Sequence, residues 1–390
     1  MQEIFFLLLP VAAFYGWYMG VRSVYQKKKK KENKLNRDYL KGLNLLFSDQ
    51  PDKAVDHFIS LLDVDSDTIE THLALGNLFR QRGEVDRAIR IHQNLIARPS
   101  LTREQRDLAL LQLGQDFYHS GLLDRSLDVF TQLKESPEYK ELALENLLKI
   151  YQQMQDWDEA LLIMKQLNKI VTTKERVTTL AYLYCCVADE LFAPEDNKKK
   201  IKLYNKAIAT SRYCMSARIA LSAHYEAQGD IEQALEILAK IPEIDIDFTE
   251  IILDKLLYLS AKINDEEGLI KYLYRIVSMG GGASAVILLS KLIFKHRGEV
   301  QAQHFMQQEL EKNPTMKGFN KLISYYLKQA TGENEIKSLS FLQSLLENQI
   351  KLRAHYRCRK CGYSTARLHW LCPSCKTWGR IKPIRGLDGE

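Results

Sequence analysis

From residue 38 to residue 350, apolar residues recur every three or four positions, which is the spacing of one face of an amphipathic helix. No run with the two-residue alternation of a strand precedes the C-terminal end. A longer motif repeats within this helical pattern, L-G-x-x-[YF]-x-x-x-G-x-x-x-x-A-x-x-x-F. Its best copies begin at Leu75, Leu113, Leu147 and Leu221. The sequence therefore predicts an all-α body made of similar helical units.

The small residue at the Ala position of the motif sets the register of the copies. These register residues are Ala54, Ala88, Ser126, Ala160, Lys200, Ala234, Gly268 and Ala302. Their spacings are 34, 38, 34, 40, 34, 34 and 34 residues, so most intervals equal 34. This period resembles the tetratricopeptide-repeat family, in which each copy is a pair of antiparallel helices. We expect a superhelix of about eight to nine repeats over residues 38–352, closed by a helix pair at Lys317 to Lys351.

Each position of the motif has a packing role. Gly and Ala stand where paired helices touch, because a larger side chain would force the helices apart. A single copy cannot bury its apolar face, so copies stack and leave a concave surface that usually binds peptides or proteins. By resemblance to the family, inward-facing residues of first helices are predicted to contact a partner. These residues are Asn77, Arg80, Gln115, Tyr118 and Lys149.

Residues 4–21 form an apolar run without any charge. As a helix this run would be about 27 Å long, against about 30 Å for the hydrocarbon core of a bilayer. We expect residues 1–21 to be a transmembrane anchor and residues 22–37 a basic juxtamembrane linker. The positive cluster follows the apolar run, which favours a short N-terminus outside the cytoplasm and a cytoplasmic body over a cleaved signal peptide.

Two further features belong to this N-terminal region. The lysines of the linker predict attraction to an anionic lipid surface. Gly16 and Gly20 form a G-x-x-x-G motif, which predicts close contact with a second membrane helix.

Four of the seven cysteines form two C-x-x-C pairs near the end of the chain. These cysteines are Cys358, Cys361, Cys372 and Cys375. Two such pairs can surround one ion with a tetrahedron of thiolates, and this donor set suits iron and zinc alike. We expect residues 353–390 to be a metal-binding module whose folding depends on that ion. The cysteines Cys185, Cys186 and Cys214 lie in helical repeat positions and are expected to pack in the core.

The two knuckles, C-x-x-C-G-Y and C-P-x-C, resemble those of rubredoxin and of small zinc ribbons. The sequence departs from rubredoxin at Lys376, where rubredoxin has Gly, and in the short loop between the pairs. We expect some aromatic residues of the module to pack against the last repeats. These residues are Tyr356, Tyr363, Trp370 and Trp378.

The net charge of +6 is distributed unevenly. Residues 22–37 carry +7 and residues 351–390 carry +8, while residues 38–350 carry −8. This acidic body disfavours binding of nucleic acid along the repeats. The motifs of P-loop enzymes, zinc proteases and serine hydrolases are absent from the sequence, so no enzymatic activity is predicted.

The order of these parts resembles the lipopolysaccharide assembly protein B family of Gram-negative bacteria. The resemblance implies an inner-membrane adaptor that faces the cytoplasm and promotes degradation of the deacetylase committing precursors to lipid A. It implies three partners, namely this deacetylase, a membrane-anchored AAA+ protease and a membrane regulator of lipopolysaccharide level. It also implies that the four clustered cysteines hold one iron or zinc ion. A homodimer is compatible with this organisation.

Two other functions remain open at this stage. The metal module could make the chain a rubredoxin-like electron carrier, or a redox or metal sensor at the membrane. The +8 C-terminal module could also bind nucleic acid, although the acidic body and the predicted anchor make this the least favoured interpretation.

Overall fold

The computed structural model describes residues 15–23, 40–42, 44–45, 53–54, 57 and 69–390. Most of the predicted anchor and linker lies outside these ranges. Residues 15–23 are described, and they are helical and exposed. Among the residues that the structure describes, none of the helices combines the length and the apolar character needed to cross a bilayer.

The chain divides into two compact units, Met1–Met154 and Gln155–Glu390. The described helices of unit 1 are α3 Ile69–Gln81, α4 Val85–Ile96, α5 Arg103–His119, α6 Leu123–Leu133 and α7 Lys140–Met154. Each packs on the next in the order α3 to α7. The buried core between them is built from aliphatic residues and from Phe79, Phe117 and Phe130.

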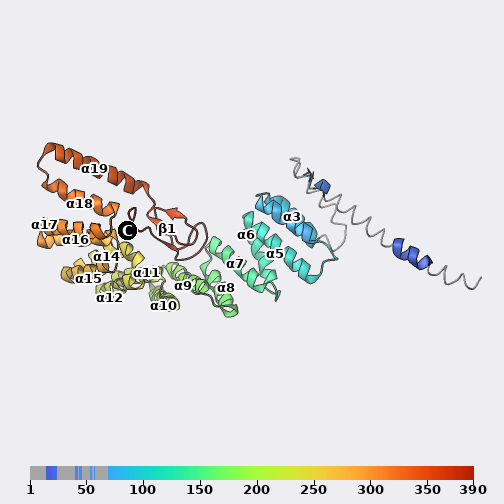
Figure 1. The fold of residues 1–390 in the computed structure, drawn as a ribbon. Coiled ribbons are helices and arrows are strands. Elements are labelled where there is room, and N and C mark those ends of the chain that lie inside the picture. Colours follow the sequence, from blue (N-terminus) through green and yellow to red (C-terminus); the bar gives the residue numbers. More distant parts are fainter. Residues whose placement is uncertain (1–14, 24–39, 43, 46–52, 55–56, 58–68) are drawn as a thin grey trace, which may run out of the picture. The chain divides into compact units, whose positions relative to one another are not determined.

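Unit 2 continues the series of paired helices and ends in a small sheet (Figure 1). Its helices are α8 Trp157–Ile170, α9 Lys174–Asp189, η3 Pro194–Asp196, α10 Asn197–Thr210, α11 Met215–Ala227, α12 Ile231–Ala239, α13 Ile241–Ile244, η4 Ile246–Phe248, α14 Thr249–Lys262, α15 Glu266–Ser278, α16 Ala283–Arg297, α17 Glu299–Lys312, α18 Met316–Gln329 and α19 Glu333–Leu352. One continuous apolar core joins α11 to α18. The predicted closing helix pair is confirmed as α18 and α19.

The predicted register of the repeats is confirmed at most copies. Ala88, Ala160, Ala234 and Ala302 are fully buried, each four residues after the N-cap of its helix. One position was wrong. In α15 the residue four positions after the N-cap Asp265 is the buried Leu269, not Gly268. The Gly268 amide instead donates to the Asp265 carboxylate at 2.9 Å, so it belongs to the cap of the helix.

The turn inside a repeat requires a left-handed residue. Gly83, Gly121 and Gly229 hold this position with φ between 79° and 87°. In the copies that lack glycine, Gln155 and Asn264 adopt φ values of 62° and 57°. Because a side chain is disfavoured in this region, the repeat geometry imposes the conformation there.

The C-terminal module contains a three-stranded antiparallel sheet in the order β2-β1-β3. Its strands are β1 Tyr356–Cys358, β2 Ser364–Thr365 and β3 Ile381–Pro383. Strand β1 pairs with both neighbours, and Cys358 lies opposite Ile381. After α19 the chain turns back, so this sheet lies beside the helices of unit 2 rather than beyond the last one (Figure 1).

Candidate metal centre

The two C-x-x-C pairs meet at one point of the module. Cys358 ends strand β1, and Cys361 follows in the first knuckle turn. The Sγ atoms of Cys358 and Cys375 are 3.7 Å apart, as are those of Cys361 and Cys372. All four Sγ atoms lie within 4.8 Å of one another. A tetrahedral ion with metal–sulfur bonds of about 2.3 Å requires sulfur–sulfur separations of about 3.8 Å. The four cysteines therefore form a metal-binding site.

Each knuckle turns through one left-handed residue after its second cysteine. Gly362 has φ 78° and Lys376 has φ 52°. Lys376 stands where rubredoxin has glycine, and it adopts the conformation that glycine would adopt more easily. The departure in sequence therefore leaves the turn intact, at a backbone cost of about 1 kcal/mol.

The protein environment distinguishes Cys361 from Cys372. The Tyr363 backbone N–H lowers the pKa of Cys361 to about 6. Burial raises the pKa of Cys372 to about 11. Cys361 is exposed and Cys372 is fully buried, so one side of the site faces solvent and the other faces the interior of the module. A bound ion would hold all four as thiolates and tie the two knuckles together.

Aromatic stacking joins the module to the helices of unit 2. The rings of Trp378 and Tyr182 stack with centroids 5.3 Å apart, and Trp157 meets Trp378 edge-on at 6.2 Å. Trp370 stacks on Phe248 at 5.8 Å. The expectation that module aromatics pack on repeats is confirmed for both tryptophans. Its location was wrong, because the contacts are with α8, α9 and η4 rather than with the last repeats.

Charged residues of the C-terminal segment extend this attachment. Lys382 Nζ lies 2.6 Å from Asp245 and 3.1 Å from Asp247. Arg385 pairs with Asp247 at 2.5 Å and donates to the Gly280 carbonyl at 2.6 Å. Although burial opposes ionisation, Lys382 and Arg385 hold the pKa of Asp247 below its usual value. These pairs fix β3 and the segment after it against η4 and the α15–α16 loop.

The last residue is anchored further along the unit. The Glu390 carboxylate accepts from the Ser284 amide at 2.8 Å and from the Ser284 hydroxyl at 2.6 Å. Lys317 lies between Glu390 and Glu250, with 2.8 Å to the latter. Glu390 is buried, whereas the side chains of Lys317 and Glu250 are partly buried. The module thus contacts helices of unit 2 that range from α8 to α18.

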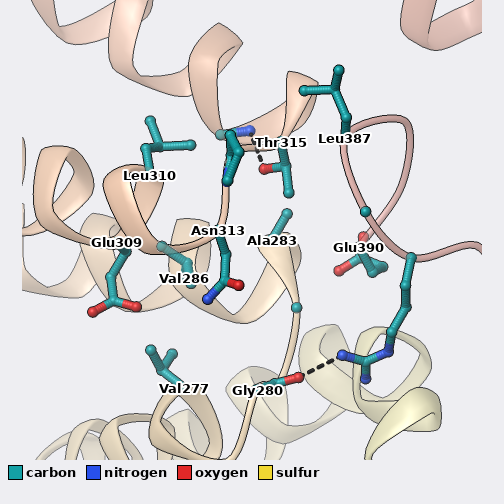
Figure 2. Close-up of a pocket in the computed structure, with 15 residues that line it drawn as sticks. Val277, Gly280, Ala283, Val286, Glu309, Leu310, Asn313, Thr315, Leu387 and Glu390 are labelled. Carbon is teal, nitrogen blue, oxygen red and sulfur yellow. Dashed lines mark hydrogen bonds between the residues drawn. The ribbon is translucent and has the colours of Figure 1, made fainter.

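A cavity of about 390 Å³ lies where this segment meets α16, α17 and α18 (Figure 2). Its wall is mainly apolar and includes Val277, Val286 and Leu310. Of the lining carboxylates, Glu309 pairs with Lys312 and Glu390 with Lys317. The lining suits an apolar group and shows no arrangement of nucleophile and base.

Comparisons with known proteins agree with this architecture. The Rubredoxin metal binding domain family matches residues 356–383, and the Tetratricopeptide repeat family matches residues 71–106. The chain is 41% identical to lipopolysaccharide assembly protein B of Escherichia coli (strain K12), with 100% of both chains covered. It is 38% identical to the protein of that name from Haemophilus influenzae (strain ATCC 51907 / DSM 11121 / KW20 / Rd), also over 100% of both chains. The chain belongs to the lipopolysaccharide assembly protein B family.

Solved structures give weaker likenesses. The crystal structure of MamA protein is 17% identical with a TM-score of 0.34, covering 48% of this chain and 96% of that chain. A tetratricopeptide repeat protein from Parabacteroides merdae ATCC 43184 is 13% identical with a TM-score of 0.35, covering 73% and 100% respectively.

In this member of the lipopolysaccharide assembly protein B family, the predicted partner-binding residues belong to unit 1 and the metal centre belongs to unit 2. The Arg80 guanidinium donates to Asp116 and to Asn77, both at 2.8 Å. Asp116 is buried and lies 2.5 Å from His92 Nδ1, so Arg80 belongs to a network inside unit 1. The side chains of Gln115 and Tyr118 are half-buried and that of Lys149 is exposed. Contact of these residues with a partner stays a prediction.

Gly16 and Gly20 lie in the described helical residues 15–23, and a Cβ at either glycine would meet nothing within 4 Å. Their contact with a second membrane helix also stays a prediction. Of the three cysteines outside the metal site, Cys185 and Cys186 lie in α9 as expected, and Cys214 is the N-cap residue of α11. Cys185 and Cys214 are buried with their Sγ atoms 3.5 Å apart, and burial raises the pKa of Cys186 to about 12.

Sequence reasoning missed the residues that receive the metal module. These are Tyr182, Asp245, Asp247, Phe248, Ser284 and Lys317. The distribution of charge in the sequence was the one indication of this contact. The C-terminal segment carries +8 and the helical body −8, which predicts attraction between the two but not the positions that meet.

Proposed function

We propose that this protein is a non-catalytic adaptor, anchored in the bacterial inner membrane with its body in the cytoplasm, that regulates lipopolysaccharide synthesis. The observation that carries the proposal is the 41% identity with lipopolysaccharide assembly protein B of Escherichia coli over the whole of both chains. The helical repeats, which suit protein binding, and the four-cysteine site support it.

In this proposal the adaptor promotes degradation of the deacetylase that commits precursors to lipid A. The protease is a membrane-anchored AAA+ enzyme, and a membrane regulator of lipopolysaccharide level restrains the adaptor. No chemical step falls to the adaptor itself. The adaptor confines the deacetylase to the membrane near the protease. The effective concentration of the deacetylase at the protease is therefore raised.

The metal module has a structural part in this mechanism. It covers aromatic residues of α9 and η4 and holds the C-terminal segment against α16 and α18. Zinc or iron in the four-thiolate site would contribute the folding free energy that so small a module lacks. Loss of the ion is then expected to alter the surface that the repeats offer to partners.

The test is the half-life of the deacetylase after protein synthesis is stopped, in cells that lack this protein and in cells that carry it. We expect a long half-life without the protein and a short one with it. Cys372→Ser should behave like the deletion, whereas Cys186→Ser, which changes a cysteine outside the metal site, should behave like the wild type.

An unchanged half-life in the deletion strain would remove the degradation role. If, in addition, the purified protein held iron that was reversibly reduced, the electron-carrier alternative would replace the adaptor function.

A further inference from the structure

Among the described residues of unit 2, positive side chains without a carboxylate partner recur on α8, on α10 and in the turn that follows α10. Lys165 and Lys169 lie on α8, Lys202 and Lys206 lie on α10, and Arg212 lies in the turn after α10. These five side chains are called the basic patch below. They stand out because residues 38–350 as a whole carry a net charge of −8.

A single ring brings the two helices of the basic patch together. The Nζ atoms of Lys165 and Lys206 lie 5.7 Å and 4.9 Å from the centroid of the Tyr184 ring on α9. Tyr184 is 4% exposed, so its ring is fixed in the core. Ammonium ions over an aromatic face are attracted by its quadrupole. The two lysines are therefore held near one another on the surface between α8 and α10.

The guanidinium of the basic patch is held in a similar way. Arg212 lies 4.8 Å from the centroid of the Tyr213 ring and donates to the Tyr213 hydroxyl at 2.7 Å. Tyr213 is 50% exposed. This cation is thus positioned at the surface without a carboxylate.

Within the described part of the chain, none of the five cations lies within ion-pair distance of a carboxylate. Other cations of unit 2 do pair, including Lys295 with Glu266 and Lys382 with Asp245. Like charges that are held close together repel each other, and a bound anion relieves that repulsion. The basic patch is therefore prepared for an anionic ligand.

We propose that the basic patch binds an acidic segment of a partner protein. On each helix its lysines are four residues apart, which is about 6 Å along the axis. Alternate side chains of an extended peptide are about 7 Å apart, so carboxylates on one side of such a peptide match this spacing.

The charge of the surrounding body favours a peptide over an anionic bilayer. A bilayer is an extended negative plane, and the net charge of −8 on residues 38–350 opposes its approach. A narrow peptide contacts the basic patch alone. The inference concerns the chemistry of the bound segment, and it holds whether or not the partner is the client of the proposed degradation.

The experiment uses the purified full chain in a non-ionic detergent. Its probe is a fluorescein-labelled peptide of alternating glutamate and serine, with the glutamine–serine peptide as the uncharged control. Fluorescence anisotropy at low ionic strength should show binding of the acidic peptide only, weakening as salt is added. The variant K165Q/K202Q/K206Q should bind it between about threefold and a hundredfold more weakly, as expected for three partly exposed ion pairs.

Two further variants distinguish an effect of the basic patch on peptide binding from an effect of the net charge of the protein. K165R/K202R/K206R keeps the charges and should bind nearly as the wild type does. K271Q/K291Q/K351Q removes three exposed lysines from α15, α16 and α19, and should also bind nearly normally. Circular dichroism and a thermal melt of each variant establish that it is folded.

Equal binding of the acidic peptide by the wild type and K165Q/K202Q/K206Q would overturn the proposal. So would an equal loss of affinity in K271Q/K291Q/K351Q, because the effect would then be one of net charge. Flotation with phosphatidylglycerol vesicles is the last arm, and we expect the wild type and K165Q/K202Q/K206Q to float equally. If the wild type binds no acidic peptide and the variant alone loses flotation, the occupant is a membrane and the proposal fails.

Discussion

Single glycines set the closest helix contacts of the repeats. A Cβ at Gly114 would lie 2.7 Å from Cζ of Phe130, and one at Gly76 would lie 2.4 Å from Nε2 of His92. The copy in α11 has the larger Ser222 at the equivalent position, and at the position of Phe130 it has Leu238, which is smaller than Phe130. A larger residue at one of the two facing positions is therefore accompanied by a smaller residue at the other.

Gly114→Ala should destabilise unit 1 by about 1–3 kcal/mol, because the added methyl group meets the Phe130 ring in a packed core. Urea unfolding followed by circular dichroism measures the change. The control is a double-mutant cycle with Phe130→Leu, which removes the opposing ring. A favourable coupling of about 1 kcal/mol is expected, whereas strict additivity would show that the two residues do not clash.

Lys317 provides a second prediction at this scale, since it neutralises two carboxylates. Lys317→Met leaves Glu250 and Glu390 together without their cation, and unit 2 should lose about 3 kcal/mol of stability. Lys312→Met is the matched control, because the Lys312 side chain is 66% exposed and its pair with Glu309 contributes at most about 0.5 kcal/mol. Equal melting temperatures of the two variants would show that the Lys317 cluster contributes no more than an exposed ion pair.

Some residue positions could be predicted from the sequence and others could not. The register residues Ala88, Ala160 and Ala234 recur in a pattern, so their burial followed from spacing alone. The register was misassigned at α15, because Gly268 is small for another reason. A Cβ at Gly268 would clash with the Asp265 carboxylate, which accepts a hydrogen bond from the Gly268 amide. The cysteines were found because metal chemistry restricts both residue type and spacing.

Among the elements, the helices were predictable and the position of the module was not. Helical periodicity is a local property, and it gave the closing pair α18 and α19. Docking of β1–β3 beside α8, α9 and η4 depends on contacts between residues far apart in sequence, such as Trp378 with Tyr182. Neither the repeat period nor a sequence motif predicts which two distant residues will be in contact.

The aromatic stack is expected to be the main attachment of the module to the helices. Trp378→Ala removes a ring that is 6% exposed and contacts both Tyr182 and Trp157. The attachment should weaken by about 3–5 kcal/mol, as for other buried tryptophans. Hydrogen exchange of β1 and β3 measures it, and amides there should exchange faster while those of α16 change little.

Tyr363→Ala is the control for this prediction. It also removes an aromatic residue of the module, but Tyr363 is 38% exposed. Exchange in β1 and β3 should remain close to that of the wild type. Similar acceleration in both variants would mean that the module is held by its charged segment rather than by the stack.

At the scale of the whole molecule, the metal site and the helical repeats are linked through the attached module. An ion held by the four thiolates would bind the folded module more tightly than its unfolded chain, so it would stabilise every contact that requires the folded module. Those contacts include the ring stacks on Tyr182 and Phe248 and the ion pairs of Asp247. The helices have their own apolar core from α11 to α18, which does not depend on the ion.

Removal of the metal with a strong chelator should therefore release the module and leave the repeats folded. Three of the four tryptophans of the chain, Trp157, Trp370 and Trp378, lie at the docking contacts, so their fluorescence should shift to longer wavelength as they enter water. The far-ultraviolet circular dichroism should change little, because α8–α19 remain helical. Addition of zinc should reverse the shift in the wild type but not in Cys372→Ser. Unshifted fluorescence in fully stripped protein would show that the module folds without its ion, and the link between metal and repeats would be lost.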